Sequence, residues 1–211
     1  MESPFRGALD PLALSEVVFR QNPNTELQFI KEATLLDWRK DLRNDLLHLA
    51  KAHVMTEMIL RYAPQGVPLQ EEFERLEQSL SEFNETCGNS ANTTTHKSSI
   101  FARWLLDTCD MWGYNLDLGT CSRCGKTLDK PATDFFPETG GFICHACLGV
   151  ETPRARTETL QGLWALHTGK EIEHPEFTEN ALLTYLRHHI GFLKEIHSIK
   201  FLNETRKLFG R

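Results

Sequence analysis

Two closely spaced cysteine pairs constrain this chain more than any other sequence feature. Cys121 and Cys124 form the first CxxC pair, and Cys144 and Cys147 form the second after 19 intervening residues. A CxxC turn can direct both sulfurs toward one point, so two such turns can supply a tetrahedral thiolate shell. This spacing is typical of zinc sites. We therefore expect a zinc ribbon with four cysteine ligands, and one Zn²⁺ per chain, at about residues 117–150.

Three interpretations of these cysteines are open. Structural zinc is favoured because four thiolates leave no open coordination position for a substrate. A disulfide would suit an oxidising compartment, but the first residues lack the basic-then-apolar pattern of a secretory signal. A redox-active CxxC does not explain why two pairs occur together. His145, inside the second pair, could replace a ligand, but we expect it to be exposed.

The rest of the chain indicates a mainly helical protein. Apolar residues at helical spacing predict helices from about Asp37 to Tyr62, with Asp37 as N-cap, and from Leu69 to Phe83. A third helix is expected to start near Ser98 or Ser99 and to end at Gly113. The polar residues 84–98 predict an exposed loop. After Pro153 the helical pattern returns, and its last segment carries Phe192, Ile196, Ile199 and Leu202.

The first 36 residues favour β-structure. Strand-forming residues fill Leu12–Phe19 and Leu27–Ile30, and Asn22-Pro23-Asn24 between them is a turn sequence. Two strands alone are only marginally stable in water, so this hairpin must pack on something else. The predicted fold is thus mainly α: a β-hairpin over residues 1–36, followed by a helical domain over 37–211 that contains the zinc ribbon.

Charge is distributed unevenly along the chain. The net charge is −6, so the whole chain is not a polycation that coats DNA. Residues 186–211, however, carry six Lys and Arg residues against two Glu residues. We expect an apolar groove here that holds a short acidic peptide. Its candidate partner-binding or DNA-binding residues are Arg187, Lys194, Lys200 and Arg206. A solvated helix face is the plainer alternative.

No pattern in the sequence predicts catalysis. There is no G-x-S-x-G, no H-E-x-x-H and no Walker-type phosphate loop. A metal-dependent hydrolase or deaminase would need three protein ligands plus a water and a nearby Glu, whereas this chain offers four cysteines. We therefore expect no catalytic residue and no enzymatic activity. No apolar stretch approaches the ~18 residues of a membrane-spanning helix. Trp104, Trp112 and Trp164 lie at helical spacing, which favours core packing over base stacking.

Taken together, these segments resemble the bacterial recombination mediator family RecO. The cysteine module with its Phe-Pro and Gly-Gly stretch is the most specific part of the likeness. The segments that carry it are Phe5–Leu12, Leu105–Tyr114, Cys121–Gly125, Phe135–Gly141, Cys144–Cys147, Tyr185–Gly191 and Lys200–Leu202. The resemblance implies that the hairpin is the remnant of an OB-fold, a barrel that needs five strands.

The same resemblance implies a function without catalysis. RecO-like proteins bind single- and double-stranded DNA, promote annealing, work with RecR and help to load RecA in the RecF-type pathway. Their helical domain docks the C-terminal tip of single-strand DNA-binding protein. A cytoplasmic, nucleoid-associated location in bacteria follows from such a role. The alternative is a protein-interaction adaptor that has a structural zinc ribbon and no DNA binding of its own.

Overall fold

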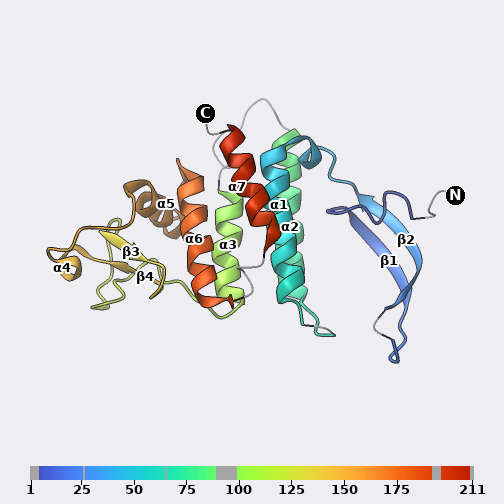
Figure 1. Ribbon diagram of the computed structural model, residues 1–211, viewed down its shortest axis with the longest axis horizontal. Helices are drawn as coiled ribbons and strands as arrows, with labels where there is room; N and C mark the ends of the chain where they lie inside the picture. Colours follow the sequence, from blue (N-terminus) through green and yellow to red (C-terminus); the bar gives the residue numbers. More distant parts are fainter. Residues whose placement is uncertain (1–4, 26, 65, 89–98, 192–195, 210–211) are drawn as a thin grey trace.

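A helical bundle forms the centre of the molecule, with a small β-structure on either side (Figure 1). The computed structural model describes residues 5–25, 27–64, 66–88, 99–191 and 196–209. Within these ranges the chain has seven α-helices and two antiparallel sheets of two strands each. This confirms the predicted fold class of a mainly helical chain with an N-terminal hairpin. The elements are β1 (Leu14–Arg20), β2 (Phe29–Asp37), η1 (Leu42–Asn44), α1 (Leu46–Tyr62), α2 (Gln70–Gly88), α3 (Ile100–Met111), β3 (Asp134–Phe136), β4 (Gly141–Ile143), α4 (His145–Leu148), α5 (Thr157–His167), α6 (Pro175–His189) and α7 (His197–Phe209).

The N-terminal hairpin was correctly predicted. β1 pairs antiparallel with β2, and the side chain of Asn22 accepts the Asn24 N–H at 3.0 Å in the turn. Apolar side chains on both strands stay exposed, among them Phe19 and Phe29. The hairpin is joined to the bundle by Arg39, whose buried guanidinium donates to the Leu12 carbonyl and forms an ion pair with Glu77 on α2.

The predicted start of the first helix is wrong. Asp37 is the last residue of β2, and its carboxylate accepts the N–H of Arg39 at 2.8 Å. The N-cap of α1 is Asp45, whose Oδ1 accepts the N–H groups of Leu47 and His48 at 3.0 Å each. The short helix η1 between the two aspartates extends the apolar helical period, which is why the period alone misplaces the boundary.

The polar segment 84–98 is not a loop throughout. Helix α2 continues to Gly88, so residues 84–88 are helical, and residues 89–98 lie outside the described residues. The side chain of Asn84 explains part of this extension, because its Oδ1 accepts the N–H groups of Asp41 and Leu42 at 3.0 and 3.1 Å. The last turns of α2 are thereby fixed to the segment that leads into α1.

The core lies between the helices, as the aromatic spacing predicted. Trp104 and Phe101 on α3 are fully buried, and Trp112 stacks on Tyr62 of α1 with ring centroids 4.1 Å apart. Trp164 is only partly buried against the same core. Of the helices in the described ranges, none combines the length and the hydropathy needed to cross a bilayer.

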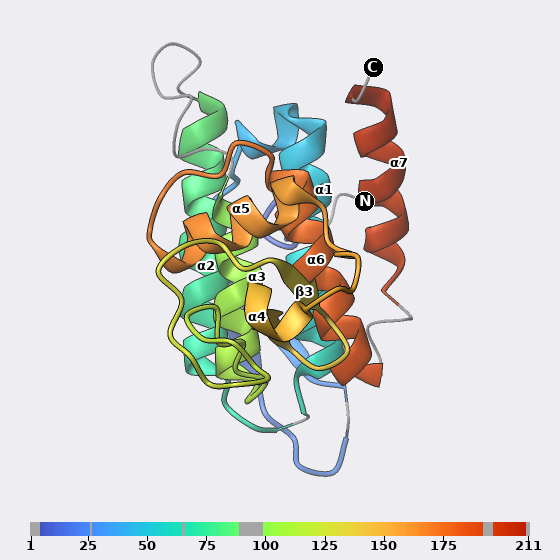
Figure 2. The same ribbon diagram turned by 90° about the vertical axis from the view of Figure 1, so that its left-hand side faces the viewer.

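The last helix, α7, packs along α1 although the two are far apart in sequence. Glu57 on α1 accepts the N–H groups of His197 and Ser198 and the Ser198 hydroxyl, so its carboxylate holds the start of α7. Phe192, which we expected in this last segment, lies outside the described residues. Seen along the long axis of the molecule, β3 and α4 lie in front of the bundle (Figure 2).

Candidate metal centre

The structure brings the four predicted cysteines together. The sulfurs of Cys121, Cys124, Cys144 and Cys147 all lie within 4.8 Å of one another. The Cys124 and Cys144 sulfurs are 3.9 Å apart. A tetrahedral site with Zn–S bonds of about 2.3 Å has sulfur–sulfur edges of about 3.8 Å, so the cluster has the size that such a site needs. These four residues could therefore bind a metal ion.

Local backbone structure explains why the first pair forms a turn. The Gly125 N–H donates to the Cys121 carbonyl at 2.8 Å, and Gly125 has φ of +70°, a conformation that favours glycine. Close packing explains Gly141, because a Cβ there would lie 2.3 Å from the Cβ of Ser122. Ser122 in turn donates its N–H to the Phe142 carbonyl at 2.9 Å, which aligns the first cysteine turn with β4.

The second pair is held by a short helix. Cys144 is the N-cap of α4 and Cys147 lies within that helix, where its N–H donates to the Cys144 carbonyl at 3.1 Å. Phe135 on β3 and Phe142 on β4 form a buried edge-to-face pair. The neighbouring Phe136 is only half-buried. His145 is exposed, as predicted.

The thiols differ in their affinity for protons. Burial works to raise the pKa of Cys121, but backbone N–H groups led by that of Cys144 outweigh it and lower this pKa to about 6. Hydrogen bonds with the Cys124 and Cys144 thiols raise the pKa of Cys147 to about 12. Without a metal ion, therefore, the thiolate of Cys121 is stabilised while Cys147 keeps its proton. A bound cation would compete with those protons.

The remaining two cysteines stand apart from this cluster. Burial raises the pKa of Cys109 to about 12, which makes it an inert core thiol. Cys87 lies near Asp45 and His48, and one ligand atom of each lies within 4.8 Å of the others. Asp45 is already engaged there, because it caps α1 and its Oδ2 lies 2.9 Å from Nδ1 of His48. Helix capping accounts for this arrangement, and we assign no metal to it.

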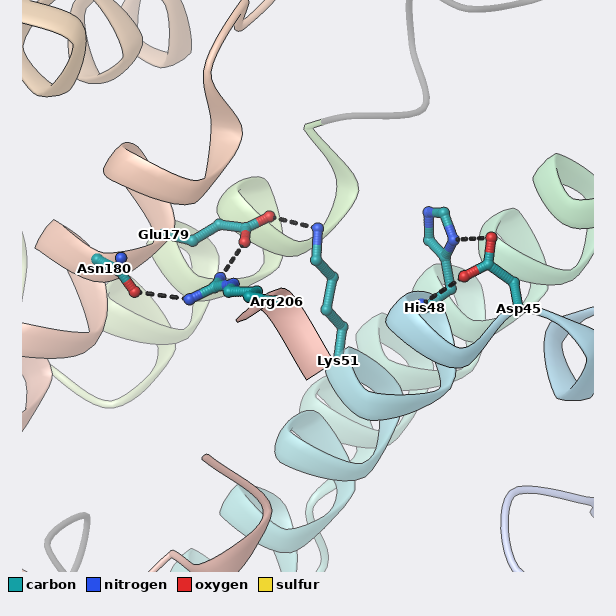
Figure 3. A network of polar contacts seen from close by, with 6 residues as sticks. All are labelled: Asp45, His48, Lys51, Glu179, Asn180 and Arg206. Atoms are coloured by element: carbon teal, nitrogen blue, oxygen red, sulfur yellow. Dashed lines mark hydrogen bonds and ion pairs between the residues drawn. The ribbon is translucent and has the colours of Figure 1, made fainter. Parts of the chain in front are cut away.

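The predicted partner-binding residues do not all lie together. Arg206 on α7 bonds Glu179 and donates to Asn180 at 2.6 Å, so it is part of the fold (Figure 3). Lys200 is exposed on α7, and Arg187 is half-buried on α6. Lys194 lies outside the described residues. Their role in binding a partner stays a prediction.

Two features next to the ribbon were missed by the sequence analysis. Asp134 at the start of β3 is completely buried, and its carboxylate accepts the N–H groups of Arg154 and Ala155. Arg154 and Arg156 lie over phenylalanine rings beside the ribbon. The sequence shows only that two arginines come just before a predicted helix. It does not indicate which residues the two arginines contact.

Comparison with known proteins decides the family. A family model described as "Recombination protein O C terminal" matches residues 43–196. This range includes the central helices and all four clustered cysteines. The chain belongs to this family. Membership supports a role in DNA repair and recombination, and it agrees with the RecO resemblance of the sequence.

Relatives over most of the chain agree with the RecO assignment. The protein of Desulforamulus reducens is 26% identical over 96% of this chain and 78% of its own length. That of Syntrophobacter fumaroxidans is 25% identical over 95% of this chain and 80% of its own length. That of Roseiflexus sp. is 26% identical over 86% of this chain and 65% of its own length. Each is named DNA repair protein RecO.

Proposed function

We propose that this chain is a non-enzymatic mediator of DNA repair by homologous recombination, which binds DNA and partner proteins. In this proposal it promotes strand annealing and the loading of RecA in the RecF-type pathway. The observation that carries the proposal is the family match over residues 43–196. The four-thiol cluster supports it, because it agrees with the cysteine module on which the RecO resemblance depends.

The proposed metal is one Zn²⁺ per chain, held by Cys121, Cys124, Cys144 and Cys147. Zinc would cross-link the two cysteine turns to each other, and in small modules such binding contributes on the order of 10 kcal/mol to folding. Four thiolates fill a tetrahedral shell, so no position is left for a water or a substrate. The chain therefore contributes no catalytic residue in this proposal.

The proposed partners are single- and double-stranded DNA, RecR and the C-terminal tip of single-strand DNA-binding protein. A cavity of about 510 Å³ beside α7 supports the last of these. Its lining includes the cation Lys207 and apolar side chains such as Leu47 and Phe209, whereas Lys51 and Arg206 are paired there with Glu179. Such a lining suits an acidic peptide with apolar residues. The proposed location is the bacterial cytoplasm, at the nucleoid.

A titration with DNA tests this function. The full chain is titrated against a fluorescent single-stranded oligonucleotide, and fluorescence anisotropy is measured over a series of salt concentrations. We expect binding at low salt that weakens steeply as salt rises, because counterions are released from the phosphates. If the folded, metal-loaded chain does not bind DNA at low salt but still binds the peptide tip, the adaptor function replaces the mediator function.

A further inference from the structure

A cleft of about 480 Å³ lies where the cysteine ribbon meets the helices. One wall is the end of β3 and the residues that follow, including Phe136 and Glu138. The opposite wall is α6, which contributes Phe177 and Asn180. Residues 154–156, which lead into α5, line the cleft between these walls. The ribbon views show the elements that carry these residues, with β3 next to α5 and α6 (Figures 1 and 2).

Each of two exposed arginines in this cleft lies over an aromatic ring. The guanidinium carbon of Arg154 is 5.1 Å from the centroid of Phe136, and that of Arg156 is 5.3 Å from the centroid of Phe177. Both rings are half-buried, and both arginines are exposed. Glu138 is the one acidic side chain of the lining. The cleft therefore presents two cationic groups, each supported by an apolar ring face.

Asp134 fixes the segment that carries the arginines. Its carboxylate is fully buried, and it accepts the Arg154 N–H at 3.0 Å and the Ala155 N–H at 2.8 Å. A third N–H, that of Phe135, donates to it at 2.8 Å. Backbone N–H groups thus satisfy the Asp134 carboxylate, so the guanidinium groups of Arg154 and Arg156 do not pair with it. A backbone held in this way loses less entropy on binding a ligand.

These groups match the chemistry of single-stranded nucleic acid. A guanidinium fork fits the oxygens of a phosphate, and both phenylalanine rings and guanidinium planes stack on bases. In a duplex the bases are already stacked on one another, so only a single strand offers free base faces to such a site. An acidic peptide could pair with the two charges, but it has no base to stack on the rings or guanidinium planes.

We propose that this cleft binds single-stranded nucleic acid, with phosphates on Arg154 and Arg156 and a base against Phe177. The Phe136 ring already contacts Arg154 and Arg123, whose guanidinium carbons lie 5.1 and 5.7 Å from its centroid. The inference rests on the proposed function and deepens it, because it assigns the nucleic-acid contact to the junction of ribbon and bundle. Of the predicted basic residues of the C-terminal segment, the three within the described ranges, Arg187, Lys200 and Arg206, do not line this cleft.

Two double variants test the proposal by anisotropy with a labelled oligo-dT of about 20 nucleotides. Arg154→Ala with Arg156→Ala removes the two cations. We expect roughly tenfold weaker binding. The slope of log K against log salt concentration should also become shallower by about 1.4. Phe136→Leu with Phe177→Leu keeps the apolar volume and removes the aromatic faces. We expect roughly tenfold weaker binding with an unchanged salt slope.

The matched control is Lys130→Ala with Lys170→Ala, which removes the same charge from exposed positions outside the cleft lining. We expect this control to bind DNA like the unaltered chain. Equal losses in the control and in the arginine variant would overturn the proposal, because they would indicate a diffuse charge effect. Circular dichroism and metal content establish that all variants are folded.

The remaining outcomes separate this inference from the proposed function. If the unaltered chain binds DNA and the arginine variant binds equally well, the cleft assignment is wrong and the DNA-binding function stands. If the unaltered chain does not bind DNA at all, both fail. If only an acidic peptide binds, and the arginine variant loses it, the cleft is a peptide site and the nucleic-acid proposal is overturned.

Discussion

Lys51 on α1 and Glu179 on α6 form a buried ion pair, 128 positions apart in the sequence. Nζ of Lys51 donates to Oε1 of Glu179 at 2.7 Å, and the two side chains are 6% and 0% exposed. Arg206 on α7 bonds the other oxygen of Glu179 (Figure 3). One carboxylate thus joins α1 to α6 and α7, the last two helices of the described chain.

This arrangement predicts an asymmetry between two variants. Glu179→Gln leaves the buried Lys51 and the half-buried Arg206 without a counter-charge, and we expect it to lower the free energy of unfolding by about 3–5 kcal/mol. Lys51→Met leaves Glu179 paired with Arg206, so we expect a clearly smaller loss. Urea unfolding followed by circular dichroism measures both. Equal losses, or a larger loss for Lys51→Met, would show that Glu179 is not the centre of the network.

Close packing of α5 against α6 predicts a steric effect at Gly162. A Cβ at this position would lie 1.9 Å from Oγ1 of Thr178, so the two helices would have to move apart. We expect Gly162→Ala to cost about 1–3 kcal/mol of stability. The control is Gly191→Ala, where a Cβ meets no atom of the described residues within 4 Å. Thermal unfolding should separate the two variants, and similar midpoints would contradict the packing described here.

Acid should loosen the contact between α1 and α7. Burial works to raise the pKa of Glu57, but hydrogen bonds from Ser198 and His197 outweigh it and hold this pKa below its ordinary value of 4.5. A carboxylate with a lowered pKa in the folded state stabilises the fold above its unfolded-state pKa, and this contribution disappears as pH falls through the folded-state pKa. The relevant window therefore begins near pH 4.5 and extends below it.

Glu57→Gln isolates this effect because it keeps the size and one acceptor of the side chain. We expect the variant to be about 1 kcal/mol less stable than the unaltered chain at pH 7. The difference should shrink as pH falls below 4.5 and vanish in stronger acid. Urea unfolding at a series of pH values measures it. A difference that stays constant across this range would mean that the Glu57 carboxylate does not titrate with folding.

The cavity beside α7 gives a prediction about peptide binding. Lys207 lines this cavity and Lys200 is exposed on the same helix. We expect Lys200→Glu with Lys207→Glu to weaken binding of a labelled peptide copy of the C-terminal tip of single-strand DNA-binding protein at least tenfold, because two attractions become repulsions. The control, Lys31→Glu with Lys40→Glu, makes the same charge change elsewhere. Unchanged affinity in the α7 variant would exclude these residues from the peptide site.

The sequence predicted what depends on local spacing. The CxxC turns could be found because each pair is set by a few consecutive residues, and Trp104 could be placed in the core because helical periodicity marks the buried face. The sequence did not locate the N-cap of α1, because Asp37 and Asp45 are the same residue type and only the backbone geometry distinguishes them.

Contacts between distant residues were beyond the sequence analysis for a similar reason. Arg206 was expected to be available to a partner, but its side chain bonds Glu179, 27 positions away. The Asp134 contact with Arg154 crosses 20 positions and depends on how the ribbon folds back on the helices. A single sequence records neither pairing, because charge and spacing are compatible with many partners.

Metal content of the purified, reduced full chain tests the central claim most directly. Native mass spectrometry should find one zinc ion per chain, and Cys124→Ser should lose it while Cys87→Ser, outside the four-thiol cluster, retains it. Loss of zinc should unfold the ribbon and leave most of the helical signal in place. A chain that is fully folded and free of metal under reducing conditions would contradict the claim that the four cysteines form a structural zinc site.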